Sequence, residues 1–274
     1  MMLPLWPMAG AAEPIRVVSI NMCADELLLR LAEPGSIAAV SHLSRDPRNS
    51  AFAAQAAAYP VTHGRAEEVM ALAPDLVLAS AFTAPATLSM LRRLGVPLAT
   101  LGVPHTFDGI ADQMREVARL LGRPENGERE VRRMAARLAA AASDAPARAT
   151  ALVLQANNIV VGRDTLIDGV LAQAGLVNLA ARDGIAGYGR MSLEAIVSRP
   201  PDILIVDSDE ERNAGAPALA TRALRHPALA ALARQGAMRV IAAPSRLWTC
   251  AGPGAAEAVA YLRHALAAGT GEAP

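Results

Sequence analysis

The chain has 274 residues, with 26 basic and 26 acidic residues and a formal net charge of zero. The basic residues are scattered along the sequence, which argues against a nucleic-acid partner because such a surface needs a basic stripe. All 26 are arginine, so a P-loop lysine, a pyridoxal Schiff base and a lysine nucleophile are excluded. The length suits two domains of roughly 100–150 residues, and no apolar run reaches the roughly 18 residues of a membrane span.

The N-terminal segment, MMLPLWPMAGAA at residues 1–12, is apolar and ends in small residues just before Glu13. This pattern is typical of the end of a secretory signal with a cleavage site near residues 11–13, although the basic n-region is missing. We therefore predict that residues 1–14 are a signal-peptide remnant. An unstructured apolar terminus is the alternative.

Residues 15–122 alternate predicted strands and helices, which is typical of an α/β lobe with a mostly parallel sheet. The helix predicted over 24–32 has acidic residues in its first turn, and the helix over 106–121 carries an apolar stripe at helical spacing. Further strands are predicted at 16–20, 36–40 and 97–101, and a further helix at 86–94.

Residues 125–143 form one uninterrupted, highly charged stretch of strong helix formers with a narrow apolar stripe. We assign residues 123–146 to a stiff helical connector and residues 147–270 to a second α/β lobe. The second lobe is predicted to contain strands at 149–154 and 239–242, helices at 165–174 and 255–268, and a glycine-rich loop at 182–191.

One unit occurs twice, as EEVMALAPDLVLAS at 67–80 and EAIVSRPPDILIVD at 194–207, with an offset of 127 residues. Each copy predicts a short helix that begins with a carboxylate, ends before a proline and is followed by a buried strand. Two copies half a chain apart predict two similar lobes with a ligand cleft between them.

The order of these segments resembles the class III periplasmic binding proteins, which capture substrates for ABC importers of iron–siderophores, haem and vitamin B12. The resemblance covers about residues 15–268 and includes RVVSINMCADELLLRLAEPGSIAAVS at 16–41, HGRAEEVMALAPDLVLAS at 63–80 and MSLEAIVSRPPDILIVDS at 191–208. It implies two Rossmann-like α/β lobes with mostly parallel sheets, joined by a single long helix. It also implies a periplasmic monomer that binds a metal chelate, needs no cofactor, is not an enzyme and delivers its ligand to an ABC permease in the inner membrane.

The resemblance further implies that Glu67 and Glu194, one in each lobe, dock into arginine pockets of the permease. Each glutamate also fits a structural role, because a carboxylate in a first helical turn is stabilised by the helix dipole and Ser192 can cap its helix. Their symmetric placement favours docking, where charges set the register between partners.

Ligand contacts in such folds come from loops that follow the strands. Aromatic residues make up only 3% of the chain, so the placement of Tyr188 and Trp248 in such loops favours a role in ligand binding. In vitamin B12-binding relatives, aromatic residues occupy positions similar to those of His63 and Tyr188. The first of these is a histidine here, which weakens a cobalamin assignment. The candidate ligand-binding residues are Met22, His63, Arg65, Phe82, Tyr188, Arg190, Arg246 and Trp248.

The ligand itself is suggested by charge. The three candidate arginines, Arg65, Arg190 and Arg246, suit the oxygens of an anionic chelate and favour a ferric siderophore, with cobalamin or haem next. Three roles stay open for His63: an axial ligand for haem or cobalt, a hydrogen-bond donor to a siderophore, and a surface residue. The five histidines are dispersed, so no protein metal site is expected unless His63 or Tyr188 binds the iron of haem.

Two further features leave alternatives open. Cys23 and Cys250 lie in opposite halves of the chain, and a bond between them would restrain lobe movement, so we predict free, partly buried thiols; one disulfide is the alternative. The segment GPGAAE at 252–257 has two of the three glycines of a nucleotide-binding turn. A Rossmann-type enzyme is therefore the alternative function. Glu257 stands where the third glycine of such a turn would be, and its carboxylate would repel a pyrophosphate.

Overall fold

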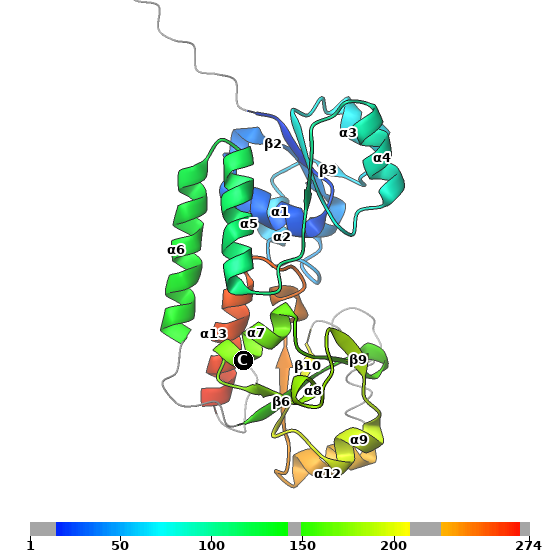
Figure 1. The fold of residues 1–274 in the computed structure, drawn as a ribbon, viewed down its shortest axis with the longest axis vertical. Coiled ribbons are helices and arrows are strands. Elements are labelled where there is room, and N and C mark those ends of the chain that lie inside the picture. The colour runs from blue at the N-terminus through cyan, green and yellow to red at the C-terminus, as the bar shows by residue number, and fades with distance from the viewer. Residues whose placement is uncertain (1–14, 142–148, 209–225, 269–274) are drawn as a thin grey trace, which may run out of the picture.

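The computed structural model describes residues 15–141, 149–208 and 226–268. The chain folds into two α/β lobes, one above the other in Figure 1, with helix α6 (Pro124–Ala141) along one side of the upper lobe. The predicted fold of two mostly parallel α/β lobes is confirmed. The predicted leader at 1–14 and residues 142–146 of the predicted connector lie outside the described residues.

The N-terminal lobe is built on a five-stranded parallel sheet in the order β3-β2-β1-β4-β5. Strands β1 and β4 are buried along their whole length, which explains why each is a continuous apolar run in the sequence. The elements of this lobe are β1 (Val17–Ser19), α1 (Met22–Leu31), β2 (Ile37–Ser41), α2 (Ala53–Ala56), β3 (Val61–Thr62), α3 (Ala66–Ala71), β4 (Leu76–Ser80), α4 (Pro85–Arg93), β5 (Leu98–Leu101) and α5 (Phe107–Leu120).

The C-terminal lobe has a six-stranded mixed sheet in the order β11-β10-β6-β7-β9, with β8 paired to β6. Only the pairs β6–β7 and β7–β9 are antiparallel among the strands described. Its elements are β6 (Thr150–Gln155), β7 (Ile159–Val161), α7 (Leu166–Gln173), β8 (Val177–Asn178), α8 (Leu179–Arg182), β9 (Tyr188–Arg190), α9 (Leu193–Ser198), β10 (Ile203–Asp207), α12 (Pro227–Arg234), β11 (Arg239–Ala243) and α13 (Ala255–Ala267).

The antiparallel edge of this sheet corrects the prediction of a glycine-rich loop at 182–191. The chain reverses after β6 through Asn157 and Asn158, both with φ of 58°, a conformation that asparagine tolerates in hairpin turns. A Cβ atom on Gly162 would lie 2.0 Å from the carbonyl oxygen of Ile185, so only glycine lets the segment before β9 approach the hairpin. A three-residue edge strand is too short to produce a recognisable alternation of apolar and polar residues.

The duplicated unit has the same structural role in both lobes. Asp75 precedes β4, and its Oδ2 accepts a hydrogen bond of 2.8 Å from the backbone N–H of Arg16, just before β1. Asp202 precedes β10, and its Oδ2 accepts one of 2.7 Å from the backbone N–H of Thr150, the first residue of β6. The Pro-Asp pairs therefore fix the start of an adjacent parallel strand in each lobe.

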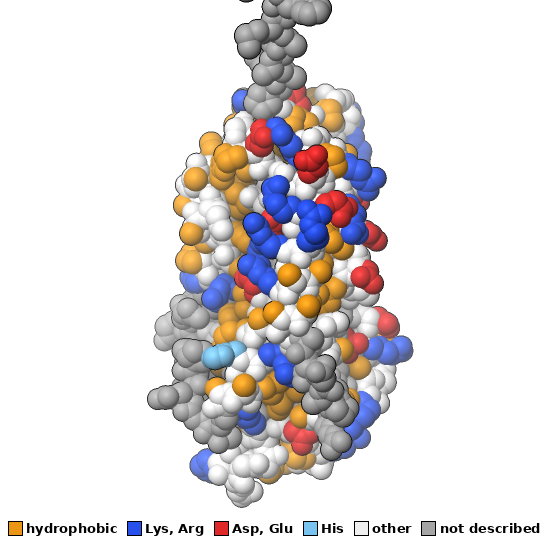
Figure 2. Space-filling view, turned by 90° about the vertical axis from the view of Figure 1, so that its left-hand side faces the viewer, with side chains coloured by type: hydrophobic (Ala, Val, Ile, Leu, Met, Phe, Trp, Pro, Cys, Tyr) orange, Lys and Arg blue, Asp and Glu red, His pale blue; other side chains and the backbone are white. Residues whose placement is uncertain are grey.

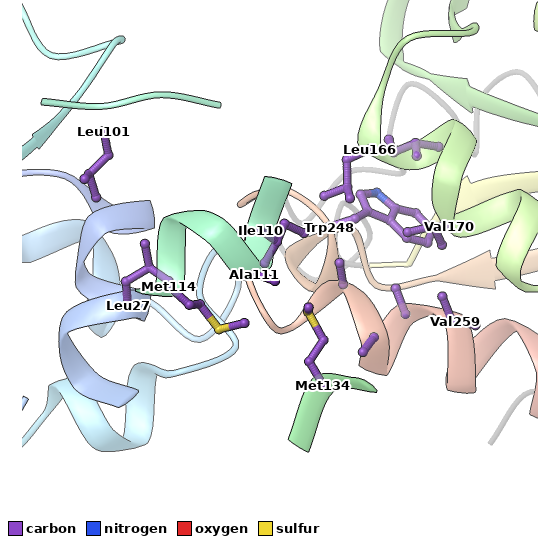
Figure 3. Packing of buried hydrophobic residues seen from close by; sticks show 14 of the residues in the cluster. Leu27, Leu101, Ile110, Ala111, Met114, Met134, Leu166, Val170, Trp248 and Val259 are labelled. Atoms are coloured by element: carbon purple, nitrogen blue, oxygen red, sulfur yellow. The ribbon is translucent and has the colours of Figure 1, made fainter. Parts of the chain in front are cut away.

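One apolar cluster runs from the N-terminal lobe into the C-terminal lobe. It includes Leu27 of α1, Met114 of α5 and Met134 of α6, together with Val170 of α7 and Val259 of α13. Figure 3 shows these side chains in a row that crosses from one lobe to the other. The lobes are thus joined by packed helices as well as by the chain that follows α6.

Helix α6 buries few of its residues, and most of its surface carries charge. Figure 2 shows arginine and acidic side chains interspersed over this face of the molecule. A groove of about 510 Å³ between α5 and α6 is lined partly by Arg115 and Glu128, which form an ion pair of 2.8 Å. Of the helices in the described segments, none combines the length and apolarity needed to traverse a bilayer.

Candidate ligand-binding cleft

The larger of two adjoining cavities lies where strands of the C-terminal sheet end. It has a volume of about 380 Å³. Gln155 at the end of β6 and Asp207 at the end of β10 contribute to its wall, as expected for parallel strands that open a crevice at their carboxyl ends. The remaining lining residues are Val153, Leu154, Ala156, Asn157, Ile159, Ile167, Tyr188, Val206, Ser245, Trp248 and Thr249.

The two aromatic residues of this cavity differ in their surroundings. Tyr188 lies on edge strand β9 and is 66% exposed, so its phenol ring is available to a ligand. Trp248 is only 7% exposed and packs beside Leu166 and Val170 (Figure 3). The indole of Trp248 therefore belongs to the apolar core as well as to the cavity wall.

The polar groups of the larger cavity are mostly neutral. Gln155 and Asn157 carry amides, and Ser245 and Thr249 carry hydroxyls. Asp207 is the one carboxylate among the described lining residues, and it accepts hydrogen bonds from the Ser245 hydroxyl at 2.6 Å and backbone N–H at 3.1 Å. Such a lining presents hydrogen-bond donors and acceptors without a strong positive field.

A smaller cavity of about 40 Å³ lies on the side of the N-terminal lobe. Cys23 at the start of α1, Ser80 at the end of β4 and Phe82 just after it contribute to its wall. Thr249 lines both cavities, so the two adjoin at this residue. Together they form a cleft with one wall from each lobe.

The prediction of free thiols was wrong, because Cys23 and Cys250 form a disulfide with a Cα–Cα distance of 5.0 Å. Cys23 lies in the N-terminal lobe at the start of α1, and Cys250 lies in the segment that leads into α13. Figure 1 shows this segment between the two lobes. The bond therefore links the two lobes covalently.

The family profile described as "Periplasmic binding protein" matches residues 17–246, which is most of the chain. The chain belongs to this family. The assignment confirms the predicted class of substrate-binding protein and the prediction that the protein is not an enzyme. Within the segments that the structure describes, no group of three or more histidine, cysteine, aspartate or glutamate residues could hold a metal ion.

Three similar proteins illustrate the range of the family. A cobalamin-binding protein of Halobacterium salinarum is 27% identical over 206 residues, which cover 73% of this chain and 56% of that protein. A haem-binding protein from Roseiflexus sp. RS-1 is 29% identical, with a TM-score of 0.74 and coverage of 92% of this chain and 97% of that one. The vitamin B12-binding protein of Vibrio cholerae, at 21% identity, TM-score 0.68 and coverage of 95% and 99%, shares the fold. The chain spans about half the length of the curated relatives it matches.

The candidate ligand-binding residues of this binding protein fall into two groups. Tyr188 and Trp248 line the larger cavity and Phe82 lines the smaller one, while Met22 directly precedes the cavity-lining Cys23. The other four, His63, Arg65, Arg190 and Arg246, are absent from the described lining of both cavities.

The second group lies on loops and edges of the lobes. His63 follows β3, and its ring stacks on that of His42 with centroids 4.6 Å apart. Its Nδ1 lies 3.6 Å from Glu68, and the Nε of Arg65 lies 3.8 Å from the same carboxylate. Arg190 ends edge strand β9, and Arg246 lies in the short 3₁₀ helix Ser245–Leu247.

Several cavity-lining residues were missed from the sequence. Gln155 and Asp207 are the last residues of strands whose positions were predicted, so the rule that ligands meet the carboxyl ends of strands could have identified both. Thr249 and Ser245 carry no comparable signal, because they enter the wall through the segment that Cys250 ties to α1.

Glu67 and Glu194 are both exposed and lie in the first turns of α3 and α9. Figure 1 shows these two helices on the side of the molecule away from α6, one in each lobe. The hydroxyl of Ser192 caps α9 through the backbone N–H of Ala195 at 3.2 Å. Hydrogen bonds from its own backbone N–H and then from Ser192 hold the pKa of Glu194 below its usual value, so this carboxylate stays charged.

Proposed function

We propose that this binding protein captures a corrinoid of the cobalamin type in the cleft and delivers it to an ABC permease. The observation that carries the proposal is the lining of the larger cavity, which combines apolar side chains with amides and hydroxyls. A corrin ring with amide side chains presents matching donors, acceptors and apolar faces. The similarity to a cobalamin-binding protein over 73% of the chain supports the same class of ligand.

The charge of the cavity disfavours the ferric siderophore that the sequence suggested. That preference depended on Arg65, Arg190 and Arg246, and none of them is among the described residues that line either cavity. An anionic chelate is best held by guanidinium groups that contact its oxygens.

Haem is the second candidate, favoured by one specific observation. The phenol of Tyr188 is 66% exposed at the larger cavity, and a phenolate is a known type of axial ligand for haem iron. The similarity to a haem-binding protein at 29% identity supports this candidate. His63 directs its Nδ1 towards Glu68, which leaves Nε2 as the nitrogen that could bind a metal.

Location and partner form part of the proposal. A disulfide between both cysteines of the chain supports an oxidising compartment, which agrees with a periplasmic location. The exposed Glu67 and Glu194, one in each lobe, are proposed to dock onto basic sites of the permease.

The proposal is tested by titrating the purified protein with cyanocobalamin, haemin and a ferric siderophore. Trp248 lies in the cavity wall, and the only other tryptophan is Trp6, so a Trp6→Phe variant reports on the cleft alone. We expect saturable quenching by cyanocobalamin at low micromolar concentration or below. A Soret shift with haemin and no response to cyanocobalamin would establish haem instead, and saturable binding of the siderophore alone would contradict both candidates.

A further inference from the structure

Helix α1 of the N-terminal lobe is attached to the start of α13 of the C-terminal lobe by two successive contacts. The first is the Cys23–Cys250 disulfide. The second is a hydrogen bond of 2.9 Å from the backbone N–H of Gly254 to Oε1 of Glu26. Glu26 is only 5% exposed. We call these four residues the interlobe clamp.

At the clamp, the backbone of Gly252 and Gly254 lies directly against the carboxylate of Glu26. A Cβ atom on Gly252 would lie 2.7 Å from the carboxyl carbon of Glu26, and one on Gly254 would lie 3.2 Å from Oε1. A side chain at Gly252 would force the Glu26 carboxylate out of this position. The pair of glycines in GPGAAE, which resembled a nucleotide-binding turn, therefore serves to seat the Glu26 carboxylate.

Ion pairs extend the attachment to the connecting helix. Arg30 of α1 lies 3.3 Å from Glu257 of α13 and 3.6 Å from Glu130 of α6. Arg137 of α6 lies 2.7 Å from the same Glu257. Helices α1, α6 and α13 thus meet beside the clamp, and all three also contribute to the shared apolar cluster.

The clamp also forms part of the cleft. Cys23 lines the smaller cavity, and Thr249, the neighbour of Cys250, lines both cavities. Trp248, one residue further, belongs to the wall of the larger cavity. A shift of Cys250 away from α1 would therefore carry Thr249 and Trp248 with it and widen the cleft.

We propose that the interlobe clamp fixes the width of the cleft and so positions the two walls that hold a bound chelate. The clamp residues act as positioning residues, because they set the separation of the walls. A pre-set cleft loses less conformational entropy on binding and keeps its ligand longer. The effect on the ligand rests on the function proposed above, whereas the effect on the lobes does not.

The test compares the oxidised wild type with a Cys23→Ser/Cys250→Ser variant and with Glu26→Ala. Hydrogen–deuterium exchange is measured over residues 22–27 and 249–257 without ligand, and the dissociation rate is measured with cyanocobalamin. We expect faster exchange in both segments and dissociation about tenfold faster in both variants. Glu26→Gln keeps an oxygen that accepts from Gly254 and should restore wild-type behaviour.

The matched control is Leu91→Ala, which removes a fully buried side chain from a separate apolar cluster of the N-terminal lobe. It should lower the melting temperature but change neither readout. If the serine variant fails to fold, the same measurements are made on folded wild type treated with a phosphine reductant. Unchanged exchange after loss of the disulfide, or an equal change in the Leu91→Ala control, overturns the proposal. Absence of cyanocobalamin binding to the wild type refutes the proposed ligand, while the exchange data still decide on the clamp.

Discussion

At the scale of single residues, the two cavity aromatics differ in what they contribute. Tyr188 is largely exposed on an edge strand, whereas Trp248 is packed into the core that joins the lobes. Both were predicted from the sequence as ligand contacts, because aromatic residues are rare in this chain and these two were placed in loops that follow strands. Their unequal burial could not be deduced, since it depends on where the Cys250 segment lies.

This difference leads to a paired prediction. Tyr188→Ala should weaken cyanocobalamin binding by more than about tenfold and leave the melting temperature unchanged, because its ring is exposed. Trp248→Ala should weaken binding and also cost about 3–5 kcal/mol of stability, because it leaves a cavity in the core. Isothermal titration calorimetry measures the loss of affinity, and thermal unfolding measures the loss of stability. Equal stability loss in both variants would contradict the assignment.

Two buried carboxyl groups on α1 make a second residue-scale prediction. Burial raises the pKa of Asp25 from 3.8 to about 7, against hydrogen bonds from Ser19, Ser44 and Ser41 that lower it. Burial likewise raises the pKa of Glu26 from 4.5 to about 7, against its bond to Gly254 and the charge of Arg30, while Glu257 raises it further.

Because both pKa values are higher in the folded state, the folded protein retains protons that the unfolded chain releases as the pH rises. The resulting stabilisation is complete below about pH 4 and is lost as the pH rises through about 7, on the order of a few kcal/mol. Urea unfolding at several pH values should show this decline. The Asp25→Asn/Glu26→Gln variant should flatten it, and an unchanged pH profile in that variant would contradict the assignment.

At the scale of elements, the sequence predicted best where one segment carries its own signal. The two helix–Pro-Asp–strand units were predicted, and in the structure Asp75 and Asp202 hold the neighbouring strands in the same way. The hairpin formed by β6 and β7 and the edge strand β9 were missed, because short strands at a sheet edge depend on their pairing partners.

The first turns of α3 and α9 carry the element-scale prediction. The Glu67→Ala/Glu194→Ala variant should abolish transport by cells while cyanocobalamin affinity stays at the wild-type value, because both carboxylates are exposed. A matched control is Glu116→Ala, which removes an exposed carboxylate from α5. Uptake assays and equilibrium titration provide the two measurements. Loss of affinity in the double variant, or equal loss of uptake in the control, would exclude a docking role.

At the scale of the whole molecule, the sequence predicted two lobes but not how firmly they are joined. A connector helix was expected to be the joint, and the structure adds a shared apolar cluster, a disulfide and a buried carboxylate. The disulfide and the hydrogen bond join residues 227 and 228 positions apart. No local pattern encodes such a pairing, since either cysteine alone fits a free thiol equally well.

The separation of the cysteines has a consequence for how the protein is made. Cys23 precedes Cys250 by 227 residues, so this pair cannot form until that whole stretch has been synthesised. Oxidation of the pair therefore follows synthesis of Cys250, and it closes residues 23–250 into one covalent loop. In the chain-entropy description a loop of this size disfavours the unfolded ensemble by about 5 kcal/mol, so Cys250 stabilises the fold by fixing a residue made long before it.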